Sequence, residues 1–113
     1  MADADLEAAL QAFASRCNDN ERLRQMNRDW SRVIAIKPEG GDPVYLAYRS
    51  GEVSVTDAQE PDLVVEGPAE TLHAIFTGAM TPTEPYMDGT LLVRGSQDDM
   101  MRLDIISLLI WGE

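Results

Sequence analysis

The sequence predicts a single α+β domain in which helices pack against one five-stranded, mainly antiparallel sheet. Three observations lead to this prediction. Apolar residues recur at helical spacing near both ends of the chain, segments of alternating apolar residues fill the middle, and short turn segments separate them. With 113 residues the chain has the size of one domain, placed at residues 1–113, and it can bury a core of its own.

The first two elements are expected to be helices. Residues 4–16 form an amphipathic helix, because their apolar residues recur every three or four positions. These residues, with one more just beyond the segment, are Leu6, Ala9, Leu10, Phe13 and Cys17. Asn18, followed by Glu21 three places later, resembles a capping box, so a second short helix is expected around residues 20–28.

Four strands are expected next, because runs rich in valine and isoleucine alternate with turn residues. They are residues 30–37, which end at Pro38, and then residues 44–49, 52–56 and 63–66. Residues 39–42 form a turn by composition. Ser50 and Gly51 lie between two alternating runs and predict a tight hairpin. The alternation suits an antiparallel sheet with one better-buried face.

The second half adds a helix, a loop, a strand and a final helix. In chain order these are residues 68–78, 79–88, 90–94 and the segment that follows Ser96. Pro68 suits a first helical turn, and Gly78 ends that helix. Residues 79–88 contain two prolines and two methionines and are expected to be a loop. Ser96, with Asp99 three places later, caps the last helix.

No residue pattern predicts catalysis, a metal site or a cofactor. His73 is the only histidine, and it is expected to face outward from its helix. Cys17 is the only cysteine, so no internal disulfide can form, and a reducing, cytoplasmic location is expected. The Gly-x-Ser-x-Gly elbow, the phosphate-binding loop and the histidine and cysteine sets of zinc sites are all absent from the sequence. We therefore expect a protein that is not an enzyme.

The charge of the chain argues against nucleic acid as a partner. The net charge is −11 and the pI is about 4.3, so phosphate backbones would be repelled. Residues 16–37 nevertheless hold six basic and three acidic residues. This basic segment either contacts an anionic surface or pairs with local acids and solvent. No secretory leader is expected, and the apolar run Ile105–Trp111 is far shorter than the roughly 20 residues that span a bilayer.

The final helix is unusually apolar. Its last two turns are apolar nearly all round, whereas a helix on a protein surface needs only one apolar stripe. This helix is therefore either buried on both sides or has a face that meets a ligand, a partner subunit or lipid. Met80, Met87, Met100 and Met101 suit an adaptable apolar lining, and they equally suit ordinary core filling.

The segment from Gly67 to Gly112 carries a resemblance to a known family. Its centre reads Tyr86-Met-Asp-Gly-Thr-Leu-Leu-Val-Arg-Gly95 and precedes the apolar helix. This order resembles the second half of the sterol-carrier-protein type 2 domain, and the likeness is strongest from Leu63 to Leu109. The resemblance implies helices over one face of the sheet and an internal apolar tunnel. The frequent lysine of the family is Thr90 here, which leaves the charge at the cavity rim in doubt.

The resemblance implies non-enzymatic binding, and possible transport, of a fatty acid, a sterol-like lipid or an acyl-CoA. Residues on the predicted third helix, the methionine loop and the last helix are expected to touch this ligand. They are Leu72, Phe76, Met80, Met87, Met101, Ile105, Leu108 and Leu109. The alternative is a protein-interaction or dimerisation module, in which the Ile105–Trp111 face binds a second copy or another protein. An internal cavity would favour the carrier, and an exposed apolar patch would favour the module.

Overall fold

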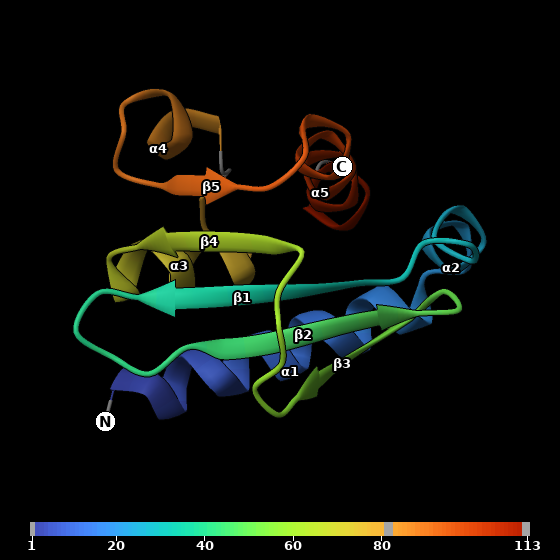
Figure 1. The fold of residues 1–113 in the computed structure, drawn as a ribbon, viewed down its shortest axis with the longest axis horizontal. Helices are drawn as coiled ribbons and strands as arrows, with labels where there is room; N and C mark the ends of the chain where they lie inside the picture. Colours follow the sequence, from blue (N-terminus) through green and yellow to red (C-terminus); the bar gives the residue numbers. More distant parts are fainter. Residues whose placement is uncertain (1, 81–82, 112–113) are drawn as a thin grey trace.

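The structure is a computed structural model that describes residues 2–80 and 83–111, with side chains for residues 6–80, 84–103, 105 and 106 (Figure 1). Its elements in chain order are α1 (Ala2–Asp19), α2 (Glu21–Met26), β1 (Arg32–Pro38), β2 (Val44–Arg49), β3 (Glu52–Thr56), β4 (Leu63–Gly67), α3 (Ala69–Phe76), α4 (Thr83–Met87), β5 (Leu92–Arg94) and α5 (Gln97–Trp111).

The strands form one five-stranded sheet in the order β3-β2-β1-β4-β5. Neighbouring strands are antiparallel except for β1 and β4, which run parallel with Ile34 opposite Leu63 and Pro38 opposite Gly67. The connection from β3 to β4 crosses one face of the sheet, and α1 and α3 cover the other face (Figure 1). The predicted α+β fold with a mainly antiparallel sheet is therefore confirmed.

The predicted hairpin at Ser50 and Gly51 is confirmed. Arg49 pairs with Glu52, which leaves a two-residue turn between β2 and β3. Both turn residues have positive φ angles, 54° for Ser50 and 85° for Gly51. This pattern matches the twist of antiparallel strands. A side chain at Gly51 would also collide with the carbonyl group of Arg24, so the turn fits closely against α2.

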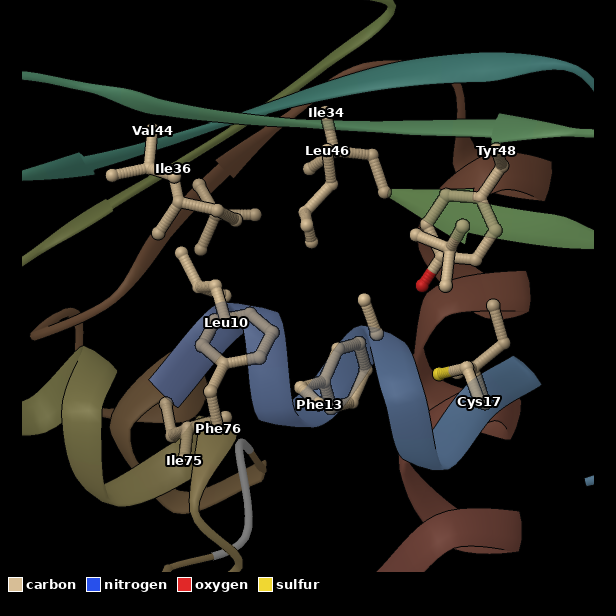
Figure 2. Packing of buried hydrophobic residues seen from close by; sticks show 14 of the residues in the cluster. Leu10, Phe13, Cys17, Ile34, Ile36, Val44, Leu46, Tyr48, Ile75 and Phe76 are labelled. Carbon is tan, nitrogen blue, oxygen red and sulfur yellow. The ribbon is translucent and has the colours of Figure 1, made fainter. Parts of the chain in front are cut away.

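The core lies between α1, α3 and the inner face of the sheet. Figure 2 shows side chains of α1 pointing toward those of β1 and β2. Phe13 of α1 meets Phe76 of α3 edge to face, with ring centroids 5.0 Å apart. Leu10, Ile34 and Leu46 have no exposed surface. Close packing of this kind makes each of these side chains costly to truncate.

The helix boundaries near residue 20 differ from the prediction. Helix α1 runs to Asp19 rather than 16, and the expected Asn18 capping box is wrong. The cap is Asn20, whose side-chain oxygen accepts a hydrogen bond of 3.1 Å from the backbone N–H of Leu23. Asn18 instead exchanges two hydrogen bonds with the backbone of Val53 on β3, at 2.8 and 2.9 Å. This pairing fixes the end of α1 to the sheet edge.

The segment predicted as a loop, residues 79–88, contains the short helix α4. Proline is compatible with this helix because Pro85 lies in its first turn. Backbone N–H groups there have no intrahelical acceptor, so the missing N–H of proline removes no helix hydrogen bond. Strand β5 is shorter than the predicted 90–94. The backbone N–H of Thr90 donates to the Asp88 carboxylate at 2.8 Å, which makes a turn and delays the strand until Leu92. Hydrogen bonds from Thr90 lower the pKa of Asp88.

Candidate functional site

The two candidates for nucleophilic or acid–base chemistry, Cys17 and His73, differ in burial. Cys17 is buried beneath the sheet, and burial raises the pKa of its thiol to about 12. The reactive species of a cysteine is the thiolate, so this thiol is inert at neutral pH. His73 is exposed on α3, as the sequence predicted. Among the described residues, no three histidine, cysteine, aspartate or glutamate side chains gather where they could hold a metal ion.

Tyr48 is a buried polar side chain that the sequence did not single out. Its hydroxyl lies beside the Cys17 thiol (Figure 2) and forms no regular hydrogen bond with a described residue. Burial, with the adjacent thiol, raises the pKa of this phenol well above its ordinary value. A hydroxyl buried without a good partner has a desolvation cost. Both groups therefore stay neutral within the core.

The predicted ligand-contacting residues divide into two groups. Leu72 and Phe76 are buried in the core beneath the sheet. Met80, Met87, Met101 and Ile105 are exposed, with exposed fractions of 40%, 79%, 57% and 42%. Leu108 and Leu109 have side chains outside the described set. The described members therefore differ in exposure, and their contact with a ligand stays a prediction.

The exposed members belong to a larger set of exposed apolar side chains. All large hydrophobic side chains that are exposed among the described residues come from residues 80–105. They are Met80, Tyr86, Met87, Leu92, Met101 and Ile105. Helix α4, strand β5 and helix α5 carry most of them, on the side of the molecule beyond β4 (Figure 1). We call these six residues the C-terminal apolar surface.

Helix α5 presents different faces to the core and to solvent. Ile106 has no exposed surface, and Met100 and Leu103 pack partly buried against the core. Met101 and Ile105, one turn apart, face outward and form an exposed stripe. The sequence left open whether α5 is buried on both sides or leaves one apolar face exposed. The described part of α5 fits the second alternative, with one buried face and one exposed apolar face.

A polar network fixes the start of α5 to the sheet. The buried carboxylate of Asp99 accepts a hydrogen bond of 3.0 Å from the indole N–H of Trp30 and one of 2.9 Å from Nε of Arg32. The hydroxyl of Ser96 accepts from the backbone N–H of Asp99 at 3.1 Å, which confirms the predicted cap. We call these four residues the Asp99 anchor. From the sequence, Asp99 was expected only to mark the start of the helix, and its partners Trp30 and Arg32 were not predicted.

The Asp99 carboxylate is stabilised in its charged form. Burial by itself would raise its pKa, but hydrogen bonds from Trp30, Arg32 and Ser96, together with the charge of Arg32, lower the pKa below its ordinary value. The anchor is therefore fully formed at neutral pH.

A second arginine reinforces the same contact. Nη1 of Arg102 donates to the backbone carbonyl of Met26 at 2.9 Å and to the side-chain oxygen of Asn27 at 3.2 Å. Its guanidinium carbon lies 5.3 Å from the centroid of the Trp30 ring, and that of Arg32 lies 5.8 Å away. Two cations therefore contact one indole ring, and cation–π attraction stabilises both contacts.

A groove of about 460 Å³ lies at the opposite end of the sheet, where β1 and β4 end and β5 begins. Its wall is lined by Lys37, Glu39, Glu66, Thr90 and Leu92, together with two prolines and four glycines. Glu66 is already paired with Arg94. None of the residues predicted to contact a ligand lines this groove. No described helix is long and apolar enough to cross a membrane.

Comparison with known protein families identifies the relationship. The model of the "SCP-2 sterol transfer family" matches residues 6–106, which is most of the chain. The chain belongs to the SCP-2 sterol transfer family. The resemblance inferred from the sequence is thereby confirmed, and family membership supports lipid binding or transfer in general. No curated protein matches the chain in a sequence search.

Solved structures confirm the SCP-2 fold. A "UbiJ-SCP2 Ubiquinone synthesis protein" is 17% identical, with a TM-score of 0.70 over 94% of this chain and 91% of that one. Sterol Carrier Protein 2 Like 2 from Aedes aegypti is 18% identical, with a TM-score of 0.65 over 90% and 95%. A solution structure titled palmitated SCP2L2 from Aedes aegypti is 18% identical, with a TM-score of 0.53 over 77% and 88%. Likeness at these identities concerns the fold.

Proposed function

We propose that this protein binds a lipid or another apolar small molecule reversibly and carries it without covalent chemistry. The C-terminal apolar surface is the observation that supports the proposal most directly. Six large hydrophobic side chains remain exposed within 26 residues, from Met80 to Ile105, while none of the described side chains before Met80 is exposed in this way. Exposed apolar patches on a soluble domain commonly mark a ligand or partner site.

The finer form of the proposal places the apolar chain of the ligand in an internal tunnel that reaches Leu72 and Phe76. Met101 and Ile105 face outward while Leu72 and Phe76 lie in the core. A tunnel lined by both groups therefore requires α5 to turn or shift when ligand enters. The Asp99 anchor lies in the first turns of α5, so it can act as the fixed point of such a movement.

The length of the ligand distinguishes a tunnel from an open surface. In a closed tunnel, affinity for saturated fatty acids rises with chain length and then falls when the chain no longer fits. On an open surface, affinity continues to rise as each added methylene buries more apolar area. Calorimetric titration of a series of fatty acids measures this dependence directly. A continuous rise would contradict the tunnel while leaving the carrier function intact.

The ligand classes that we propose are fatty acids, sterol-like lipids and acyl-CoA. One structural relative is described as palmitated, and another is described as a ubiquinone synthesis protein. Palmitate, a sterol and a quinone with an isoprenoid tail therefore make a rational first panel. The test is competition against a fluorescent fatty acid. Absence of saturable, competable binding up to tens of micromolar, roughly −6 kcal/mol of binding free energy, would refute the carrier function.

A pair of aspartate substitutions tests whether α5 contributes to the site. Ile105→Asp places a carboxylate on the exposed stripe, where the fold should tolerate it because Ile105 is 42% exposed. Ser54→Asp is the control, since Ser54 is exposed on β3, at the other edge of the sheet from β5 and outside the C-terminal apolar surface. We expect Ile105→Asp to weaken ligand binding at least tenfold and Ser54→Asp to change it little. Equal effects would contradict the assignment to α5.

Dimerisation is a second candidate function, because the exposed Met101–Ile105 stripe also suits an antiparallel contact with a second copy of α5. Light scattering on the wild type and on Ile105→Asp separates the two functions. A wild-type dimer that becomes a folded monomer with unchanged ligand affinity would favour the interaction module. A wild-type monomer that loses ligand affinity on substitution would favour the carrier.

The non-enzymatic character of the proposal has its own test. His73→Gln and Cys17→Ala should leave ligand binding unchanged, since His73 is exposed without a catalytic partner in the described chain and the thiol of Cys17 is buried. A large loss of binding or of any activity in a folded variant would reveal a site that the geometry does not indicate.

A further inference from the structure

The two arginines that flank Trp30 form a cluster that the proposed function does not yet use. Arg32 comes from β1 and Arg102 from α5, and both guanidinium carbons lie within 6 Å of the same indole ring. The Asp99 anchor holds Arg32, and the carbonyl group of Met26 holds Arg102. The two cations are therefore fixed in place by separate contacts.

Neither guanidinium uses all of its hydrogen-bond donors. A guanidinium has five N–H donors in a planar fork. Arg32 uses Nε toward Asp99 and Nη1 toward the carbonyl of Ser31, and Arg102 uses Nη1 toward Met26 and Asn27. Nη2 of each makes no hydrogen bond with a residue whose side chain is described. The Arg32 side chain is 37% exposed, so a ligand can reach it.

The charge around the two arginines is mixed. Asp99 is the carboxylate already bonded to Arg32, and Asp29, Asp98 and Asp104 lie nearby in sequence. Against these stand Arg28, which is exposed, and the two clustered arginines. The unused guanidinium donors, rather than a net positive charge, therefore favour an anion here through charge-assisted hydrogen bonds.

The cluster borders the apolar stripe of α5. Arg102 follows Met101 directly and precedes Ile105 by three positions, so its side chain lies at the edge of the Met101–Ile105 stripe. Apolar surface beside unused guanidinium donors matches an amphiphile with an apolar chain and an anionic head group.

We propose that Arg32 and Arg102 bind the anionic head group, a carboxylate or a phosphate, of the lipid whose chain covers the α5 stripe. This inference rests on the proposed function and names the chemical class of its ligand. A neutral lipid would leave the donors with water only, whereas an anionic head group gains charge-assisted hydrogen bonds. Such bonds favour the anionic ligand by about tenfold or more over a neutral one of equal chain length.

The first test varies the ligand and leaves the protein intact. Calorimetry on the full chain compares dodecanoate, dodecyl phosphate and dodecanol, with inorganic phosphate as a ligand without a chain. We expect the two anionic lipids to bind at least tenfold more tightly than dodecanol, with a difference that shrinks at high salt. Equal binding of all three lipids would overturn the head-group inference but not the carrier function. Binding of none of them would overturn both.

The second test varies the protein. Arg102→Gln should remove most of the preference for the anionic lipids while dodecanol binding is kept. Arg24→Gln on α2 is the matched control, since it removes an exposed arginine with no role in the cluster. Arg102→Lys keeps the charge but loses the fork, so we expect an intermediate preference; it also shows whether loss of the Met26 contact alone weakens binding.

Two results would overturn the placement. One is a preference for anionic lipids that survives in a folded Arg102→Gln variant or is lost equally in Arg24→Gln, because the head group would then bind elsewhere. The other is saturable binding of inorganic phosphate without preference among the lipids, which would make the cluster a free-anion site.

Discussion

The part of the chain up to residue 79 and the part from residue 80 onward differ in how they bury their large hydrophobic side chains. The first part, with α1 to α3 and four strands, buries its large hydrophobic residues in one cluster, including Phe13, Leu46 and Phe76. The second part leaves six of them exposed and contributes few to that cluster, among them Leu91 and Ile106. Stability therefore depends mainly on the first part, and the exposed large apolar side chains lie in the second.

The difference also appears in how each part is attached. The first part is held by close packing between helices and sheet, as Figure 2 shows. Helix α5 packs Ile106 into the core, but it is also held by polar contacts, namely the Asp99 anchor and the bonds of Arg102 to the α2–β1 connection. Polar contacts of this kind are directional and depend on charge, whereas apolar packing does not. Four predictions, ordered from the largest expected effect to the smallest, test this contrast.

Truncation should separate the two parts most strongly. Phe13→Ala removes a fully buried ring from the contact with Phe76 and should lower the free energy of unfolding by about 3–5 kcal/mol. Ile105→Ala, on the exposed stripe, should lower it by less than about 0.5 kcal/mol. Urea denaturation monitored by circular dichroism measures both. Comparable losses would show that the exposed stripe of α5 is part of the core.

The Asp99 anchor should contribute an acid-sensitive share of stability. The lowered pKa of Asp99 means that its contribution is complete above the ordinary aspartate value of 3.8 and is lost as the pH falls through the lower pKa of the folded state. Asp99→Asn should cost about 1–2 kcal/mol at neutral pH. In that variant, the loss of stability as the pH falls below about 4 should be smaller than in the wild type by a similar amount. Denaturation curves across this pH range provide the measurement. Parallel pH profiles for the two proteins would contradict the role of the anchor.

The buried hydroxyl of Tyr48 should be dispensable for folding. Tyr48→Phe removes a group that lacks a regular hydrogen bond, so stability should stay the same or rise by up to about 1 kcal/mol. The thermal midpoint and a urea titration report the change. A clear loss of stability would mean that the contact with the Cys17 thiol is a stronger hydrogen bond than its geometry indicates.

Chemical labelling should distinguish the parts without any substitution. Met87 and Met101 are exposed by 79% and 57%, so hydrogen peroxide should oxidise them before the partly buried Met26. Cys17, with its pKa raised to about 12, should resist a maleimide in the native protein at neutral pH. Mass spectrometry of peptides reports both reactions. Protection of Met101 by added fatty acid would sharpen the comparison further, and fast labelling of Cys17 would contradict it.

Much of the first part could be predicted from the sequence because its local signals agree with its packing. The three- and four-residue spacing from Leu6 to Cys17 identifies α1 and its buried face. Ser50 and Gly51 identify the hairpin, since few other sequences tolerate two successive positive φ angles. Asn18 misled the prediction because its real partner, Val53, is 35 residues away and a local capping pattern was available.

The second part was less predictable for two physical reasons. Proline and methionine suggest a loop, yet Pro85 fits the first turn of α4. Helix α5 is apolar on most sides, so no stripe in the sequence tells which face packs inward. Ile106 rather than Ile105 faces the core, and this orientation of α5 depends on the contact of Asp99 with Trp30, which lies 69 residues away. A single sequence carries no signal for such a pair, and the Arg102 contact with Met26 was missed for the same reason.

The parallel pairing of β1 with β4 has a consequence for the order in which the chain folds. Strands β1, β2 and β3 join through short antiparallel connections and can assemble early from neighbouring residues. Strand β4 must wait until residues 57–62 have crossed the sheet to reach the far side of β1. Loop closure of this kind is slow compared with hairpin formation. Strand β5, which pairs only with β4 in the sheet order, must wait with it. A newly made chain should therefore pass through a stage in which β1, β2 and β3 are paired but β4 and β5 are not. At that stage the last helix has no complete sheet to dock against.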